Sequence, residues 1–179
     1  MIKGKKVVLR KVKTGDLPLL HKWINYPSVK RFWHGRDKTR SKDWIERHFT
    51  PIISGKSDSS CWVIEVVNKP IGLMYNTPGK SDGNEFNGRI ELDILIGEVE
   101  EWGKGYGTDA LQAMINFIFE KQRAERVFLT PYVSNDRAIH LYQKVGFQKE
   151  GIFRHFEKFE GKFVDCIMMS IIKEDFKKL

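Results

Sequence analysis

The stretch of sequence that decides the fold is Gly97-Glu98-Val99-Glu100-Glu101-Trp102-Gly103-Lys104-Gly105-Tyr106-Gly107-Thr108. It stands between a strand predicted over residues 89–96 and a helix predicted over residues 108–122, where apolar residues recur at spacings of three and four. Three glycines in five residues let the backbone turn tightly and bring N–H groups close to a ligand. The first turn of the helix adds unpaired N–H groups and the positive end of its dipole. The segment therefore predicts a site for a phosphate or pyrophosphate.

The segment does not match the two common nucleotide-binding motifs. A Walker A motif needs a glycine at position 98 and a serine or threonine at position 105, and the chain has Glu98 and Gly105. A dinucleotide fingerprint starting at Gly103 needs a third glycine at position 108, where the chain has Thr108. From this segment alone, a glycine-rich connection without a ligand stays open.

A second informative segment is Asn135-Asp136-Arg137-Ala138-Ile139-His140-Leu141-Tyr142-Gln143-Lys144-Val145-Gly146-Phe147. It predicts a helix over residues 136–145 that Asn135 caps and Gly146 ends. Ala138 and Tyr142 are four residues apart, so they share a helical face, and the small residue leaves room for a ligand beside the phenol. The alternative is a tyrosine packed in the core with its hydroxyl satisfied.

The whole chain reads as a mixed α/β layer fold in the order β-α-α-β-β-β-α-β-α-β-β. The expected strands are residues 7–10, 61–67, 71–75, 89–96, 127–133, 152–159 and 163–172, and the expected helices are residues 16–26, 41–50, 108–122 and 136–145. Residues 76–88 are rich in Gly, Pro, Ser, Asp and Asn and predict a long loop. The second helix is expected to stop before Pro51.

The two segments, in this order, resemble the GNAT superfamily of acetyl-CoA-dependent N-acetyltransferases. The family's phosphate motif, [Q/R]-x-x-G-x-[G/A], falls on residues 102–107, with Trp102 in place of the usual Gln or Arg. Its later motif, N-x-x-A-x-x-x-Y-x-x-x-G-F, is met at Asn135, Ala138, Tyr142, Gly146 and Phe147. The resemblance implies one acetyltransferase domain over residues 1–179, an α/β (α+β) fold with a mixed, mostly antiparallel sheet of about seven strands flanked by about four helices, and acetyl-CoA as co-substrate.

Two narrower resemblances compete. Glu150-Gly151, Glu160-Gly161-Lys162, Asp165 and Met168 are similar to the branch of ribosomal-protein N-terminal and spermidine acetyltransferases. Trp23, Phe32-Trp33-His34-Gly35-Arg36-Asp37-Lys38 and Leu92-Asp93-Ile94-Leu95-Ile96-Gly97-Glu98 are similar to aminoglycoside 6′-N-acetyltransferases. We favour the second resemblance, because it includes residues on the expected acceptor side.

Acetyl transfer to an amine needs a base, an oxyanion donor and an acid for the leaving thiolate, because an amine at pH 7 is mostly ammonium. Glu91 and Asp93 point to the same face of strand 89–96 and are candidates to line the acceptor pocket, unless both are solvated strand residues. The resemblance implies Asp93 as general base, with Glu91, Glu98 or a water chain as alternatives. It also implies Tyr142 as the acid.

The resemblance further implies the residues that hold the cofactor. Backbone N–H groups near residues 95–97 would bind the acetyl carbonyl, Asn135 the pantetheine arm, and the amides of residues 103–108 the pyrophosphate, with the charge of Lys104 added. The full cofactor set is Ile96, Gly97, Trp102, Gly103, Lys104, Gly105, Tyr106, Gly107, Thr108, Asn135, Ala138 and Tyr142, and the acceptor set is Trp33, Glu91 and Asp93. Trp33 also belongs to a group with Trp44 and Trp62 that is either core or acceptor wall.

The net charge of +8 is unevenly distributed along the chain. Residues 1–56 carry a net +11, residues 57–101 a net −6 and residues 102–179 a net +3. Because the acidic part holds the expected acceptor strand, it suits a cationic amine better than DNA. We therefore expect a small amine such as an aminoglycoside, with a polyamine or a protein N-terminus as alternatives. The non-enzymatic hypothesis is a basic nucleic-acid-binding domain, and the sequence contains no nucleic-acid-binding motif that supports it.

The remaining features concern location and partners. Cys61 and Cys166 show no zinc-ligand spacing and read as buried small hydrophobes, so we expect a reducing cytoplasm and no metal. No apolar run is long enough for a transmembrane helix, so no membrane partner is expected. The oligomeric state stays open, a homodimer included. The basic first third is either a solvated face or a source of attraction for the 3′-phosphate of CoA.

Overall fold

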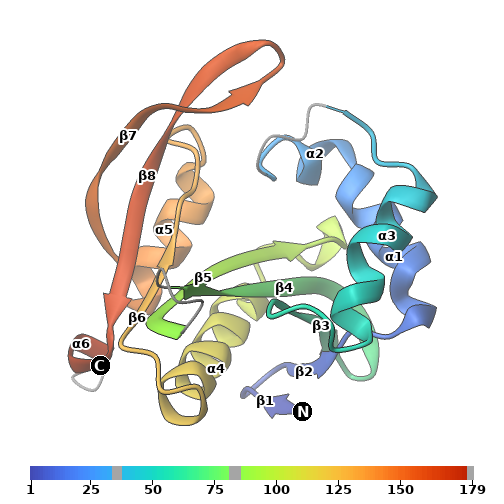
Figure 1. Ribbon diagram of the computed structural model, residues 1–179, viewed down its shortest axis with the longest axis horizontal. Helices are drawn as coiled ribbons and strands as arrows, with labels where there is room; N and C mark the ends of the chain where they lie inside the picture. The colour runs from blue at the N-terminus through green and yellow to red at the C-terminus, as the bar shows by residue number, and fades with distance from the viewer. Residues whose placement is uncertain (34–37, 81–85, 177–179) are drawn as a thin grey trace.

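The computed structural model describes residues 1–33, 38–80 and 86–176, which form one eight-stranded sheet in the order β1-β2-β3-β4-β5-β6-β8-β7 (Figure 1). Neighbouring strands are antiparallel except for β5 and β6, which are parallel. The strands are β1 Ile2–Lys3, β2 Val8–Lys11, β3 Ser60–Val66, β4 Lys69–Lys80, β5 Phe86–Ile96, β6 Arg126–Leu129, β7 Gln148–Phe159 and β8 Lys162–Ile172.

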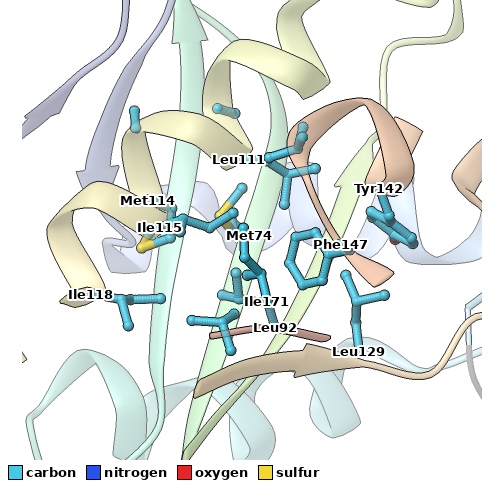
Figure 2. Close-up of a cluster of buried hydrophobic side chains, with 14 of the residues drawn as sticks. Met74, Leu92, Leu111, Met114, Ile115, Ile118, Leu129, Tyr142, Phe147 and Ile171 are labelled. Carbon is cyan, nitrogen blue, oxygen red and sulfur yellow. The ribbon is translucent and has the colours of Figure 1, made fainter. Parts of the chain in front are cut away.

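Helices cover both faces of this sheet. They are α1 Leu17–Asn25, α2 Pro27–Lys30, α3 Lys42–Ile53, α4 Tyr106–Lys121, α5 Asp136–Val145 and α6 Lys173–Phe176, with 3₁₀ turns η1 Thr14–Asp16 and η2 Val99–Glu101. On one face, Figure 2 shows Leu111, Met114 and Ile115 of α4 packed over Met74 of β4 and Leu92 of β5. On the other face, α1 and α3 bury Trp23, Ile45 and Phe49 in a cluster with Val63, Leu73 and Leu95. None of the helices in the described ranges is long and apolar enough to cross a membrane.

The fold class agrees with the prediction, a mixed α/β fold with a mostly antiparallel sheet. The described chain has eight strands and six helices where about seven and about four were expected. The additional elements are short: β1 has two residues, and α2 and α6 have four residues each. Elements of this length contain too few residues to show a hydrophobic period, so sequence patterning does not detect them.

Strands β5 and β6 are paired along only part of their length and then diverge. These strands pair only from Arg89↔Arg126 to Glu91↔Phe128, and β5 then runs on to Ile96 alone on that side. The strand expected over residues 127–133 ends at Leu129, shortly before Pro131, which has no N–H to donate to a neighbour. The backbone of β5 beyond Glu91 is therefore open toward the gap.

The expected loop over residues 76–88 is wrong at both ends, because β4 extends to Lys80 and β5 begins at Phe86. The pairing of β3 with β4 stops at Ser60↔Asn76, so the last residues of β4 have a neighbour on one side only. A proline is tolerated on such an edge, and Pro78 lies there, paired with Ile90.

The expected end of the second helix before Pro51 is also wrong, because α3 continues to Ile53. A proline in the last turn removes a single backbone hydrogen bond and keeps a helical φ. Ile52 and Ile53 pack against the cluster under α1 and α3, and this burial favours the continued helix.

Candidate active site

A cavity of about 530 Å³ lies where β5 and β6 diverge. Its walls come from α2 and the residues after it, the end of β5, the glycine loop with the first turn of α4, and the first turns of α5. Of the predicted site residues, the lining includes Trp33, Asp93, Ile96, Trp102, Gly103, Gly105, Tyr106, Gly107, Thr108, Asn135, Ala138 and Tyr142. Glu91, Gly97 and Lys104 are not part of it.

The glycine loop, predicted to be an anion cradle, lies at the wall of this cavity. Gly103 and Gly105 have φ values of 79° and 82°, in the left-handed region that favours glycine. Gly105 is the N-cap of α4, so the helix begins at Tyr106, two residues before the expected start, and no side chain caps it. Apart from its chain neighbours, no atom of the described residues lies within 4 Å of the position that a Cβ of Gly103 would take. The residues of the first turn, Tyr106, Gly107 and Thr108, line the cavity, and the free N–H groups of a helix start favour an anion such as a phosphate.

The cradle is anchored by the beginning of the chain. The Asp109 carboxylate in α4 is 8% exposed and accepts hydrogen bonds from the backbone N–H groups of Lys5, Lys6 and Val7 at 2.9, 2.6 and 2.9 Å. The Lys6 ammonium donates to the carbonyl of Lys104 at 3.2 Å. Part of the basic first third therefore lies beside the glycine loop, although outside the cavity lining. Sequence reasoning missed Asp109, because its partners are about a hundred residues away.

Gly97 has a packing role that differs from the predicted cofactor contact. Its N–H donates to the Ile71 carbonyl at 2.8 Å, and a Cβ here would lie 2.1 Å from the Trp23 ring. Because successive N–H groups of a strand point to opposite sides, the N–H of Ile96 points toward the gap that β6 leaves. The amide of Ile96 is thus the remaining candidate donor to the acetyl carbonyl.

Glu98, one of the alternative bases, is engaged elsewhere. Its carboxylate accepts hydrogen bonds from the Lys22 ammonium at 2.8 Å and from the Trp23 indole N–H at 2.7 Å. The Lys22 bond, and after it the Trp23 bond, hold the pKa of Glu98 below its ordinary value against the opposing effect of burial. A carboxylate stabilised in this way is a weak base.

Asp93 and Tyr142 face the same cavity. Burial, and secondly the charge of Asp93, raise the pKa of Tyr142, so the phenol keeps its proton at neutral pH. Tyr142 is 8% exposed and packs beside Phe147, as Figure 2 shows, and its hydroxyl has no hydrogen bond to the described part of the chain. An uncharged acid beside a carboxylate is the arrangement that proton transfer needs.

The region of α2 and the residues after it gives the cavity aromatic side chains. Trp33 lines the cavity together with Phe32 and Val29 from the α2 region. Trp33 packs with the cluster under α1 and α3, whereas Trp62 packs against Phe117 on the opposite face. The predicted tryptophan group is therefore not one cluster. Positions 34–37 of the quoted run 32–38 lie outside the described residues.

Three other predicted residues have clear partners. The Asn135 carboxamide oxygen caps α5 by accepting from the Ala138 N–H at 3.2 Å, so only its NH₂ group remains for a ligand. The Trp102 indole N–H donates to the Ile96 carbonyl at 2.7 Å. The Lys104 ammonium lies 2.7 Å from the Glu101 carboxylate, which offsets its charge. Arg137, which also lines the cavity, was missed because it fills an unrestricted position of the later motif.

Several acidic side chains of residues 57–101 are paired with basic residues. Ion pairs join Glu65 to Arg10, Glu98 to Lys22, Glu101 to Lys69 and Lys104, and Asp58 to Lys80. The cavity retains the carboxylates of Asp93 and Glu101 from this segment. The net charge of the segment is therefore a poor guide to the charge inside the cavity. No group of three or more metal-binding side chains occurs in the residues that the structure describes.

Comparison with known proteins agrees with this geometry. The family model described as acetyltransferase (GNAT) domain matches residues 13–155. The chain is 26% identical over 151 residues to an aminoglycoside N(6′)-acetyltransferase type 1 of Klebsiella pneumoniae, covering 81% of this chain and 75% of that protein. It is 27% identical over 173 residues to the spermidine N(1)-acetyltransferase of Escherichia coli K12, covering 95% and 88%. The crystal structure of spermidine N-acetyltransferase from Vibrio cholerae with CoA and spermine superposes with a TM-score of 0.83 at 24% identity, covering 96% and 98%. The chain thus belongs to the GNAT family and is an N-acetyltransferase.

Proposed function

We propose that the acceptor is the primary amine of a small cationic molecule, with an aminoglycoside as first candidate. The observation that carries this proposal is that the Asp93 carboxylate and the aromatic side chains of Phe32 and Trp33 line the same cavity as Tyr142. Carboxylates and aromatic faces both attract ammonium groups. The similarity to proteins named for aminoglycoside and spermidine acetylation supports the same acceptor class.

Asp93, Ile96 and Tyr142 each have one role in the proposed reaction. Asp93 accepts a proton from the ammonium group, which frees the nitrogen lone pair for attack on the acetyl carbonyl. The N–H of Ile96 stabilises the negative charge that develops on the carbonyl oxygen as the C–N bond forms. Tyr142 gives its proton to the sulfur as the C–S bond breaks, and it regains a proton from the second one that the attacking nitrogen loses. Acetyl-CoA supplies the activated acetyl thioester, and the cradle of residues 103–108 with the amide group of Asn135 would hold it.

An amine panel tests the acceptor. CoA release is measured with acetyl-CoA and an aminoglycoside carrying a 6′-amine, the same scaffold with a 6′-hydroxyl, spermidine, and a short peptide with a free N-terminus. Turnover with the 6′-amine and none with the 6′-hydroxyl is the expected result. Turnover confined to spermidine would establish the polyamine alternative, and turnover confined to the peptide would establish N-terminal acetylation. Failure of every amine would overturn the small-amine proposal.

We also place the enzyme in the cytoplasm and in a single domain over residues 1–179. Support for a reducing compartment comes from Cys61 and Cys166, which are both buried and free. Fractionation of the source cells tests this location. If the acceptor is an aminoglycoside, expression in a sensitive bacterium should raise the drug concentration needed to stop growth. The oligomeric state, a homodimer included, stays open, and light scattering of the purified protein decides it.

A further inference from the structure

The family motif places a Gln or Arg side chain at the start of the phosphate loop, and this chain has Trp102 there. The indole N–H of Trp102 is used by the Ile96 carbonyl at 2.7 Å, so it is not available to a phosphate. This bond holds the ring against the end of β5 and leaves its face to another residue. The guanidinium of Arg137 covers that face, with its central carbon 4.0 Å from the ring centroid.

Arg137 occupies an unfavourable place for a cation. It lies in the first turn of α5, where the helix dipole presents its positive end and favours negative charge. Partial burial lowers the pKa of its guanidinium from the ordinary value. Within the described ranges it forms no ion pair with a carboxylate, unlike Arg10 and Arg126. Its contact with Trp102 fixes its position without neutralising its charge.

The surroundings of Arg137 show what would neutralise it. The same cavity contains Gly103, Gly105 and Thr108 at the start of α4 and Asn135 at the start of α5. Two helix N-termini and one guanidinium thus converge on one space, and all three attract an anion. A planar guanidinium binds two phosphate oxygens at once, which a lysine ammonium does not do in a fixed geometry.

We propose that Arg137, held over the indole ring of Trp102, binds the pyrophosphate of CoA and takes the place of the Gln or Arg side chain missing at position 102. Trp102 is then a positioning residue that orients the guanidinium and joins the glycine loop to the end of β5. The inference depends on CoA as donor and not on which amine is the acceptor.

Equilibrium binding without any acceptor tests the proposal, so its failure is distinguishable from a wrong acceptor. Calorimetric titration compares CoA, 3′-dephospho-CoA and pantetheine. Arg137→Ala should weaken CoA and 3′-dephospho-CoA alike, by about 10- to 100-fold, and should leave pantetheine unchanged. Arg137→Lys should recover part of the loss, because it keeps the charge and loses the planar fork. Arg47→Ala removes an exposed cation outside the cavity and controls for net charge.

Variants of the ring test the positioning role. Trp102→Phe keeps an aromatic face and should bind CoA within about threefold of wild type, whereas Trp102→Leu should weaken it about as much as Arg137→Ala. The double variant Trp102→Leu/Arg137→Ala should then be little worse than either single variant. Unchanged CoA affinity in Arg137→Ala, a loss seen with CoA but not with 3′-dephospho-CoA, or an equal loss with pantetheine would each overturn the proposal. Circular dichroism confirms that each variant is folded.

Discussion

Replacing Gly97 with alanine should strongly destabilise the protein, although the substitution adds only one methyl group. The added methyl group would lie 2.1, 2.3 and 2.5 Å from the Cγ, Cδ1 and Cδ2 atoms of Trp23. These are ring atoms of a side chain with no exposed surface, so no flexible end can swing aside. Normal contact needs about 3.5 Å, so the indole must move by about 1 Å or more.

The cost of that movement follows from what the indole touches. Overpacking a core usually costs about 1–3 kcal/mol. Moving the ring also strains the 2.7 Å bond from its N–H to the Glu98 carboxylate, and a bond to a charged group contributes about 1.5–3 kcal/mol. The expected loss for Gly97→Ala is therefore about 3–5 kcal/mol, which for a chain of this size corresponds to a melting temperature lower by about 10 °C.

Urea unfolding followed by tryptophan fluorescence, together with a thermal melt, measures this loss. Gly15→Ala is the matched control, because its added methyl group has no atom within 4 Å in the described part of the chain beyond its chain neighbours, and it should change stability by less than about 0.5 kcal/mol. A Gly97→Ala protein within about 1 kcal/mol of wild type would show that α1 is free to move away from β5. The packing argument for Gly97 would then be refuted.

Three further predictions concern catalysis and pH. Tyr142→Phe should lower kcat about 100-fold in a CoA-release assay while CoA affinity by calorimetry stays unchanged, and a wild-type rate would remove Tyr142 from its role as acid. Asp93→Asn should flatten the limb of the pH–rate profile that reports the base, and an unchanged profile would transfer that role to Glu91 or to water. Asp16 accepts two hydrogen bonds from Arg10 at 2.7 and 2.8 Å, and these, with the Lys13 N–H, hold its pKa below the ordinary value although burial opposes them. Its contribution is therefore complete above about pH 4 and is lost as the pH falls through the lowered pKa, so Asp16→Asn should cost about 2 kcal/mol in urea unfolding at pH 7 and much less at pH 3.

The parts of the site predicted from sequence are those encoded by residues close together in the chain. The glycines of the loop before α4 and the spacing of Asn135, Ala138 and Tyr142 are local signals, and the cavity contains them. The structure also places Asp93 and Trp33 in its lining. Their chemical roles remain predictions, since side-chain positions do not by themselves establish a reaction step.

The parts that sequence reasoning missed depend on residues far apart. The packing of Gly97 against Trp23, and the stacking of Arg137 on Trp102, exist only after the sheet has assembled. The same holds for Pro78, whose composition signals a loop and whose place at the end of β4 is decided by where β3 stops. Periodicity describes one element at a time, so it does not reveal which elements become neighbours.

The bond network of Asp109 has a consequence for how the molecule forms and how it can be altered. The carboxylate joins a helix residue to backbone groups of Lys5, Lys6 and Val7, more than a hundred positions earlier. During synthesis these three residues are made before α4, so the Asp109 carboxylate is not yet present to accept their hydrogen bonds. Contacts between such distant positions form slowly. We expect the loop that receives the acetyl donor to become ordered late in folding. Deleting the first seven residues should therefore impair the glycine loop over residues 103–108, although that loop lies about a hundred positions later in the sequence.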